Sequence, residues 1–294
     1  MSGKRSVLLQ TVGTSLLLNL GDPRILRDYE EWCQGQPECD RGVLAEHREQ
    51  VVGASAALRQ GRLAAVAELL GEIRGRVRVL GAEVASVEAL RAEGAYAGLR
   101  AVVLLHSDTE EGAAAATVLQ QLLASRFGLA VERRRIADLR DERPSTFKVA
   151  GLRNLVQVLA RATREHGVKN VVIDATGGFK AQIATAVAFG QAFAIPVLYL
   201  FERFPEIIEF PPLPLRADLS LVQEHGDLLS LGEVPESVLV GRFGPSLSEA
   251  NARFAQFAVC LAGPSEQSGE RRWAVSPMGQ LLLELWRAAH PGPF

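Results

Sequence analysis

Short runs of aliphatic and β-branched residues recur along the chain, each bounded by turn residues. They are Ser6–Gln10, Ala101–His106, Leu129–Ile136, Asn170–Ala175 and Val197–Phe201. Longer stretches between these runs, such as Gly112–Phe127 and Leu152–His166, carry apolar residues at helical spacing. Runs such as Val171–Ile173 do not alternate with polar residues, as is typical of parallel strands buried on both faces. The pattern predicts an α/β fold with a Rossmann-like parallel sheet and helices on both faces.

The same pattern suggests two domains. Residues 43–99 are rich in Ala, Leu, Glu and Arg and predict two or three helices inserted after the first strand. The proline-rich segment Phe210–Leu215 cannot be helical, so we expect the first domain to span residues 1–215. The remainder, 216–294, predicts the elements of a small winged-helix-like α+β module: a helix over Ser246–Ala262, a polar turn over Gly263–Gly269, a strand over Arg271–Val275 and a helix over Ser276–Ala289. Ser276 suits the N-cap of the last helix, and Pro277 its first turn.

Composition narrows the class of protein. The chain has 294 residues, of which 48% are hydrophobic and 22% charged, as in ordinary globular proteins. Its net charge of −2 gives no overall basic field for long nucleic acid, but a small anionic ligand at a local site stays open. Three cysteines form neither a disulfide framework nor a zinc site, so we expect free thiols in a reducing cytoplasm, without a metal or cofactor.

No membrane segment is expected. The longest apolar stretch, Ile183–Phe201, contains Gln191 and is broken by Pro196, so a buried helix followed by a buried strand explains it better than a membrane span. The apolar run near the N-terminus is interrupted by Gln10, Thr11 and Gly13, which argues against a signal peptide.

Two turns that follow predicted strands have the chemistry of a phosphate site. Ligands of open parallel sheets bind at the carboxyl ends of the strands. After the first strand comes Thr11-Val12-Gly13-Thr14-Ser15, in which Gly13 permits a tight turn and Thr14 and Ser15 supply hydroxyl and backbone N–H groups. A simple helix cap is the alternative interpretation of this turn.

The second turn, Thr176-Gly177-Gly178-Phe179-Lys180, is the more specific signal. Its two glycines allow the backbone to approach a ligand closely, and a helix beginning near Phe179 offers free N–H groups. Lys180 in the first turn of that helix is unfavourable unless an anion is bound there, because the positive end of the helix dipole repels cations. The alternative is a glycine-rich turn with a solvated lysine. The spacing does not match a Walker A loop, and no G-x-G-x-x-G motif follows the first strand.

Two further segments allow two interpretations each. Ser107-Asp108-Thr109 follows the Ala101–His106 strand, and Ser107 or Asp108 suits the cap of the next helix, whereas Asp108 and Thr109 also suit hydrogen bonds to a ribose or base. Arg133–Arg135, followed by further basic residues, is either a solvated edge or a basic rim over an anionic ligand.

Together these motifs resemble those of the CRISPR-associated Rossmann fold (CARF) family, whose domains bind cyclic oligoadenylates made during type III CRISPR defence. The resemblance covers roughly residues 5–215 and rests on five segments in sequence order: Thr11–Ser15, Ser107–Thr109, Phe147–Leu155, Ala175–Lys180 and Phe201–Leu215. It implies a homodimer with the ring-shaped ligand across the two-fold axis.

The resemblance also implies an activity. With no evident effector domain, the chain is similar to the standalone ring nucleases, in which residues at the positions of Ser15 and Lys180 carry cleavage. It implies metal-independent attack by a ribose 2′-hydroxyl, with cyclic tetra-adenylate as the expected ring and linear products that end in a 2′,3′-cyclic phosphate. The remaining expected ligand contacts are Gly13, Thr14, Asp108, Thr109, Thr176, Gly177, Gly178 and Phe179.

Two other functions stay open. A ligand-responsive DNA-binding regulator would use the winged-helix-like tail, although the helix Ser276–Ala289, which we expect to be its recognition helix, has one basic residue, Arg287. A CARF effector ribonuclease would need an active site without the usual motif, because the pair Arg161 and His166 lies inside the CARF region and is better explained as a helical surface.

Overall fold

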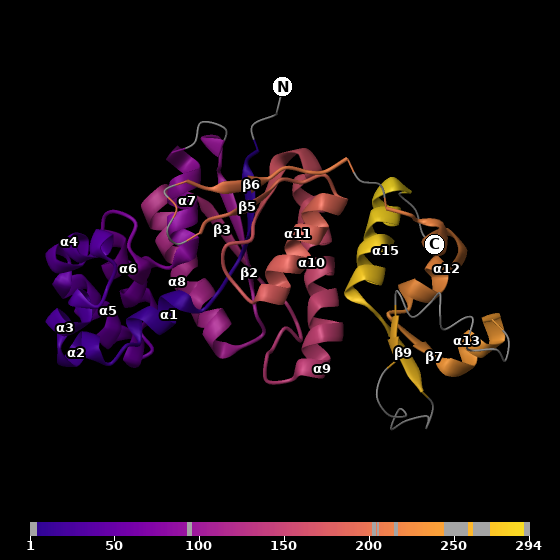
Figure 1. Cartoon of the computed structure of the whole chain (residues 1–294), viewed down its shortest axis with the longest axis horizontal. Coiled ribbons are helices and arrows are strands. Elements are labelled where there is room, and N and C mark those ends of the chain that lie inside the picture. Colours follow the sequence, from indigo (N-terminus) through magenta and orange to yellow (C-terminus); the bar gives the residue numbers. More distant parts are fainter. Residues whose placement is uncertain are drawn as a thin grey trace.

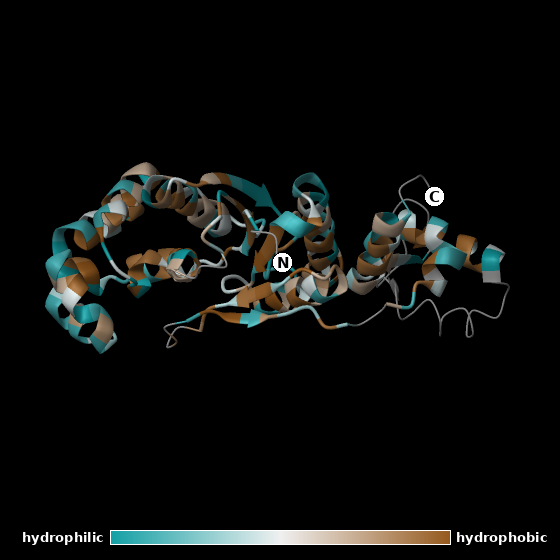
Figure 2. Ribbon diagram, turned by 90° about the horizontal axis from the view of Figure 1, so that it is seen from above, coloured by the Kyte–Doolittle hydropathy of each residue, from teal (hydrophilic) through white to brown (hydrophobic). Residues whose placement is uncertain are grey.

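The structure is a computed structural model. It describes residues 5–92, 96–201, 204, 206–214, 217–243, 258–260 and 271–290. A six-stranded sheet lies at its centre, with a helical insertion and a C-terminal module at opposite ends of the long axis (Figures 1 and 2).

The central sheet has the strand order of a Rossmann fold. Its strands are β1 (Val7–Thr11), β2 (Ala101–His106), β3 (Ala130–Arg135), β4 (Val171–Asp174), β5 (Val197–Tyr199) and β6 (Ile208–Phe210). They lie in the order β3-β2-β1-β4-β5-β6; the first five are parallel, and β6 is antiparallel to β5. From β1 the chain adds β2 and β3 in one direction across the sheet. It then returns to the other side of β1, where it adds β4, β5 and β6 in the opposite direction. This reversal between β1 and β4 is the point at which sheets of this kind bind ligands. The predicted Rossmann-like sheet is confirmed.

Helices cover both faces of the sheet. The helix α8 (Glu110–Phe127) lies on one face, whereas α10 (Leu152–His166) and α11 (Lys180–Ala192) lie on the other. Residues of β1 alternate between the two cores, with Leu8 in the first and Leu9 in the second. Short segments complete this part of the chain: α9 (Pro144–Thr146), the π-helical turn η3 (Phe147–Gly151) and the 3-10 turn η4 (Val168–Asn170). The stretch expected to hold a buried helix and strand is α11 followed by β5.

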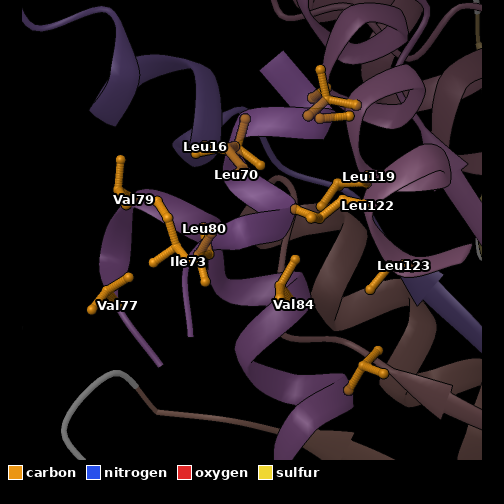
Figure 3. Close-up of a cluster of buried hydrophobic side chains, with 14 of the residues drawn as sticks. Leu16, Leu70, Ile73, Val77, Val79, Leu80, Val84, Leu119, Leu122 and Leu123 are labelled. Carbon is orange, nitrogen blue, oxygen red and sulfur yellow. The ribbon is translucent and has the colours of Figure 1, made fainter. Parts of the chain in front are cut away.

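The insertion between β1 and β2 holds the helices predicted over residues 43–99 and further helices that begin before residue 43. Together they are α1 (Ser15–Leu20), α2 (Arg24–Arg27), α3 (Tyr29–Gln34), α4 (Glu38–Glu46), α5 (Arg48–Arg59), α6 (Leu63–Glu72), the 3-10 turn η1 (Arg78–Leu80) and α7 (Ala82–Ala92). The first three are shorter than two helical turns, so they show no clear apolar period. The insertion shares its core with α8, as the cluster around Leu70, Val84 and Leu122 shows (Figure 3).

The C-terminal residues form a second, smaller sheet. Its elements are α12 (Ser220–Ser230), β7 (Glu233–Pro235), α13 (Glu236–Phe243), β8 (Ala258–Cys260), β9 (Arg272–Val275) and α15 (Pro277–Ala289). The strands are antiparallel in the order β7-β9-β8. The predicted strand and last helix are confirmed, and the Ser276 hydroxyl accepts the N–H of Gly279 at 3.0 Å as the expected N-cap.

Two expectations for this module are wrong. Residues 258–260 belong to β8 and not to the predicted helix, because they pair with β9; residues 246–257 of that helix and the turn Gly263–Gly269 lie outside the described residues. The helix α15 is not free to read DNA, because it packs on α10: Gln157 donates to Gln280 at 3.2 Å, and Arg164 pairs with the buried Glu284. The division at residue 215 and the winged-helix character stay predictions.

Within the described ranges, no helix combines the length and apolarity that a membrane span requires.

Candidate ligand-binding edge

The two glycine turns lie side by side at the carboxyl edge of the sheet. Strands β1 and β4 are neighbours, with Gln10 opposite Asp174, so the segments that follow both strands emerge together. A Cβ on Gly13 would lie only 2.9 Å from the backbone nitrogen of Gly178. Gly178 also has φ +98°, a conformation that side chains disfavour. The chain thus needs glycine at both positions to bring the turns into contact.

The first turn leads directly into α1. Thr14 is the N-cap residue, but its side chain makes no capping hydrogen bond, and the half-buried Ser15 is the first residue of the helix. The N–H of Gly13 points inward to a carboxylate oxygen of Glu83 at 2.7 Å, so it is not offered to a ligand. The backbone N–H groups that this turn is expected to offer to a ligand are therefore those of the residues after Gly13.

The second turn leads into α11 with Lys180 exposed at its first position. Phe179 is the N-cap residue, and its ring packs edge-on against Phe147 with centroids 5.4 Å apart. The amine-bearing side chain borders a shallow apolar pocket of about 290 Å³ lined by Ala175, Lys180, Ile183, Val187, Val197, Tyr199 and Phe210. A cation therefore stands at the positive end of a helix dipole, beside a surface hollow.

Gln182 fixes the start of α11, a role that sequence reasoning missed. It is fully buried, accepts the N–H of Phe179 at 3.4 Å and donates to the carbonyl of Leu105 at the end of β2 at 3.2 Å. A Cβ on Gly178 would lie 2.5 Å from its Oε1 atom. The position three residues after an N-cap is the one signal in the sequence that indicates such a role.

Beneath the turns lies a buried polar cluster centred on Asp174. One carboxylate oxygen accepts Gln10 Nε2 at 2.7 Å and the Ser86 hydroxyl; the other accepts the backbone N–H of Thr176 at 3.0 Å and its hydroxyl. The Thr176 hydroxyl also accepts the N–H of Leu200 at 2.9 Å, so this residue acts within the protein. Burial raises the pKa of Asp174, although these donors act in the opposite direction.

Glu83 of α7 completes this cluster and was also missed. It is fully buried, and one of its oxygens accepts the N–H of Gly13. Burial raises the pKa of Glu83 to about 7, and the nearby Asp174 acts in the same direction, against the hydrogen bond from Gly13. Nothing in the sequence of α7 distinguishes the buried Glu83 from Glu88, the other glutamate of this helix, which is only half-buried.

The loop after β2 lies at the same edge, but its side chains are engaged within the protein. Thr109 caps α8 by accepting the N–H of Gly112 at 3.0 Å, so the expected cap at Ser107 or Asp108 is wrong. Thr109 immediately precedes the helix and has the extended backbone of an N-cap residue.

Asp108 is held by the segment that follows β3. Its carboxylate accepts hydrogen bonds from Arg135 and Arg140, both at 3.1 Å, and from the N–H of Asp138 at 3.2 Å. Burial acts to raise the pKa of Asp108, but the bonds from Arg140 and Asp138 and the charge of Arg135 outweigh it, so this pKa is lowered. Part of the proposed basic rim is thus paired internally.

Within the part of the chain that the structure describes, no group of three or more His, Cys, Asp or Glu side chains is arranged to hold a metal ion.

The strand order and the paired turns define this part of the chain as a Rossmann-like α/β fold, in which two glycine turns meet at the β1/β4 reversal, where sheets of this kind bind ligands. Residues 78–213, just under half of the chain, match a family model described as CRISPR-associated protein (Cas_APE2256). For these residues, the match confirms the resemblance to a CRISPR-associated family that was drawn from the motifs. It includes the turn ending in Lys180 but begins after Ser15.

The other comparisons add little. No curated protein matches the chain. Among solved structures, the chain is similar to Can2 from Sulfobacillus thermosulfidooxidans in complex with cyclic tetra-adenylate, with 11% identity and a TM-score of 0.26. The match covers 65% of this chain and 57% of Can2, so this chain corresponds to little more than half of that protein.

Proposed function

We propose that this protein binds a cyclic oligoadenylate at the β1/β4 reversal and opens the ring. The contact between Gly13 and Gly178 carries this proposal, because it joins the turn of Ser15 to the turn of Lys180 at one edge. The exposed Lys180 at the start of α11 supports an anionic ligand, since a bound phosphate would relieve the repulsion between this cation and the helix dipole. Cyclic tetra-adenylate is the ring we expect.

The chemistry needs no nucleophile from the protein. A ribose 2′-hydroxyl attacks the adjacent phosphorus as it loses its proton, the bond from phosphorus to the 5′-oxygen breaks, and that oxygen takes up a proton. The products are linear and end in a 2′,3′-cyclic phosphate. The protein contributes by holding the attacking oxygen in line and by stabilising charge on the phosphorane. We assign the second role to the Lys180 amine and to a hydrogen bond donated by the Ser15 hydroxyl, with Gly13, Thr14 and the residues 176–179 shaping the site.

A symmetric pair of chains suits such a ligand. A ring of repeated adenylates presents the same groups twice about a two-fold axis, and an isologous dimer presents Ser15 and Lys180 twice in the same way. We therefore propose a homodimer with the ring across its axis. Sedimentation with and without the ring tests this arrangement, and a monomer in both conditions would contradict it.

Cleavage in EDTA tests the activity. The wild-type protein is incubated with cyclic tetra- and hexa-adenylate, beside Lys180→Ala and Ser15→Ala. Lys169→Ala is the control for the lysine, because Lys169 is exposed in η4 at the opposite end of β4. Ser125→Ala is the control for the serine, because Ser125 is exposed near the end of α8, far from this edge. Both rings surviving excess wild-type enzyme would contradict the proposal, as would unimpaired cleavage by Lys180→Ala.

A ligand-responsive DNA-binding regulator is the second candidate. The observation in its favour is the C-terminal module, in which α12 and α13 flank β7 and the three antiparallel strands lie in the order β7-β9-β8. The packing of α15 on α10 gives this module a direct connection to the first domain. A gel shift on the promoter of the protein's own gene, with and without cyclic tetra-adenylate, tests this function. A ligand-dependent shift supports it, and its absence removes it.

A further inference from the structure

Glu83 links the helical insertion to both glycine turns. Its Oε1 atom accepts the N–H of Gly13 at 2.7 Å, and a Cβ on Gly177 would lie 2.1 Å from the same oxygen. The backbone carbonyl of Glu83 accepts Gln10 Nε2 at 3.0 Å, which fixes the start of α7 to β1. One carboxyl group therefore contacts the segments that follow β1 and β4, from a helix that belongs to neither.

The packing on either side keeps this arrangement rigid. Leu16 follows Ser15, and Val84 follows Glu83; both are fully buried in the hydrophobic cluster that the insertion shares with α8 (Figure 3). A shift of α7 would therefore disturb α1 as well. The carboxyl group of Glu83 has little freedom to leave the turns.

The surroundings of Glu83 do not favour a negative charge on its carboxyl group in addition to the charge of Asp174. Asp174 is the one titratable group that faces it among the described residues, from β4, and its carboxylate has four donors. The other facing groups, Gln10, Ser86 and the glycine turns, are neutral. Within the described ranges, the Oε2 atom of Glu83 is buried without any hydrogen-bond partner. A proton on Oε2 leaves Oε1 able to accept from Gly13.

We propose that Glu83 is a positioning residue that holds both turns in the geometry that receives a polyanionic ligand, and that the ligand binds more tightly when this carboxyl group carries a proton. The identity of the ligand as a cyclic oligoadenylate rests on the function proposed above. Phosphates on the outer side of the turns add negative charge close to a buried carboxyl group. Binding therefore favours its neutral form, and by linkage the neutral form favours binding.

The magnitude of the pKa fits this role. With a pKa of about 7, Glu83 is divided between its two forms near neutrality, so a ligand can change its protonation. If ligand binding is fully coupled to the protonation of Glu83, the dissociation constant is flat below about pH 7. Above that pH it rises toward roughly tenfold per pH unit. Glu83→Gln keeps an acceptor for Gly13 without the titration, so the affinity of this variant should not follow that curve.

The first test uses the ligand-free protein. The amide resonances of Gly13 and Gly178 are followed by NMR from about pH 5 to 9 in the wild type, in Glu83→Gln and in Glu68→Gln. Glu68 is the control, because it is an exposed glutamate of the same insertion, on α6. We expect both resonances to titrate near neutral pH in the wild type and in Glu68→Gln and to stay constant in Glu83→Gln. Resonances that do not titrate in the wild type overturn the inference, even if Glu83→Gln fails to fold.

The second test measures affinity against pH with a cyclic tetra-adenylate made of 2′-deoxyriboses, which lacks the attacking hydroxyl. We expect the affinity of the wild type and Glu68→Gln to fall above about pH 7 and that of Glu83→Gln to stay flat. Equal pH profiles in all three proteins overturn the inference while the proposed function stands. Failure of the wild type to bind this ring or natural cyclic tetra-adenylate at any pH contradicts the proposed function alone, since the titration of Gly13 is measured without a ligand.

Discussion

Gly13 and Gly178 touch across the point where the sheet reverses its strand order. A Cβ on Gly13 would lie 2.9 Å from the nitrogen of Gly178, and strands β1 and β4 carry these residues to the same edge from distant parts of the sequence. The closeness of the two backbones brings the starts of the helices α1 and α11 to one edge of the sheet.

Gly178→Ala should therefore damage both stability and function. At φ +98° a side chain is strained, and its Cβ would lie 2.5 Å from Gln182 Oε1. We expect a loss of about 1–3 kcal/mol in the free energy of unfolding and a loss of ring binding, measured by urea denaturation and titration. Gly61→Ala is the matched control, because Gly61 has φ +68° with nothing within 4 Å of an added Cβ. An equal loss of stability in both variants would show that backbone strain, without the close contact to Gln182, accounts for the effect at Gly178.

Lys180→Ala should separate stability from activity. The lysine is exposed at the start of α11, where the helix dipole disfavours a cation. Its removal should raise the free energy of unfolding by about 0.3–1 kcal/mol in the absence of ligand. If this amine stabilises the phosphorane, ring cleavage should fall by roughly 10²–10³-fold. A thermal melt at low salt and a single-turnover assay measure the two effects. A variant that is both less stable and fully active would contradict this account.

The strands β1, β2 and β4 were predictable because they are buried on both faces and so leave long apolar runs such as Val102–Leu105. The turns were predictable because glycine is required where backbones approach closely. The buried polar groups were not predictable from the sequence. Glu83 lies in α7 together with a second glutamate, and its burial depends on the packing of this helix beside β1 and β4. The identity of the residue that caps α8 likewise depended on backbone geometry, which placed Thr109 next to the helix.

Asp108→Asn tests whether this carboxylate serves the fold or the ligand. The Asp108 carboxylate accepts hydrogen bonds from Arg135 and Arg140. These arginine side chains are 64% and 42% exposed, so solvent screens both ion pairs. We expect a loss of about 1 kcal/mol or less at neutral pH. Because the pKa of Asp108 is lowered, its stabilisation is complete above the unfolded pKa and disappears as the pH falls through the folded one. Ring affinity should fall less than in Lys180→Ala; an equal or larger fall would show that Asp108 contacts the ligand.

Glu83→Gln should change how the stability of the ligand-free protein depends on pH. A glutamate in water has an ordinary pKa of 4.5, whereas Glu83 has a pKa of about 7 when folded, so between these values the folded state holds a proton that the unfolded state has lost. The wild type therefore loses stability as the pH rises through this window, by an amount on the order of 3 kcal/mol if the whole shift is realised.

The two proteins should consequently differ in a pH-dependent way. Below about pH 4.5 Glu83 is neutral in both states, so its titration adds no difference between the wild type and Glu83→Gln. Above about pH 7 the buried charge of Glu83 destabilises the folded wild type alone, and the variant should be the more stable of the two. Asp174 is present in both proteins, so most of its own pH dependence cancels in the comparison. Urea denaturation at half-unit steps from about pH 4.5 to 8 measures the difference. A difference that stays constant over this range would mean that Glu83 is charged throughout, and its Oε2 atom would then need a donor that the described residues do not supply.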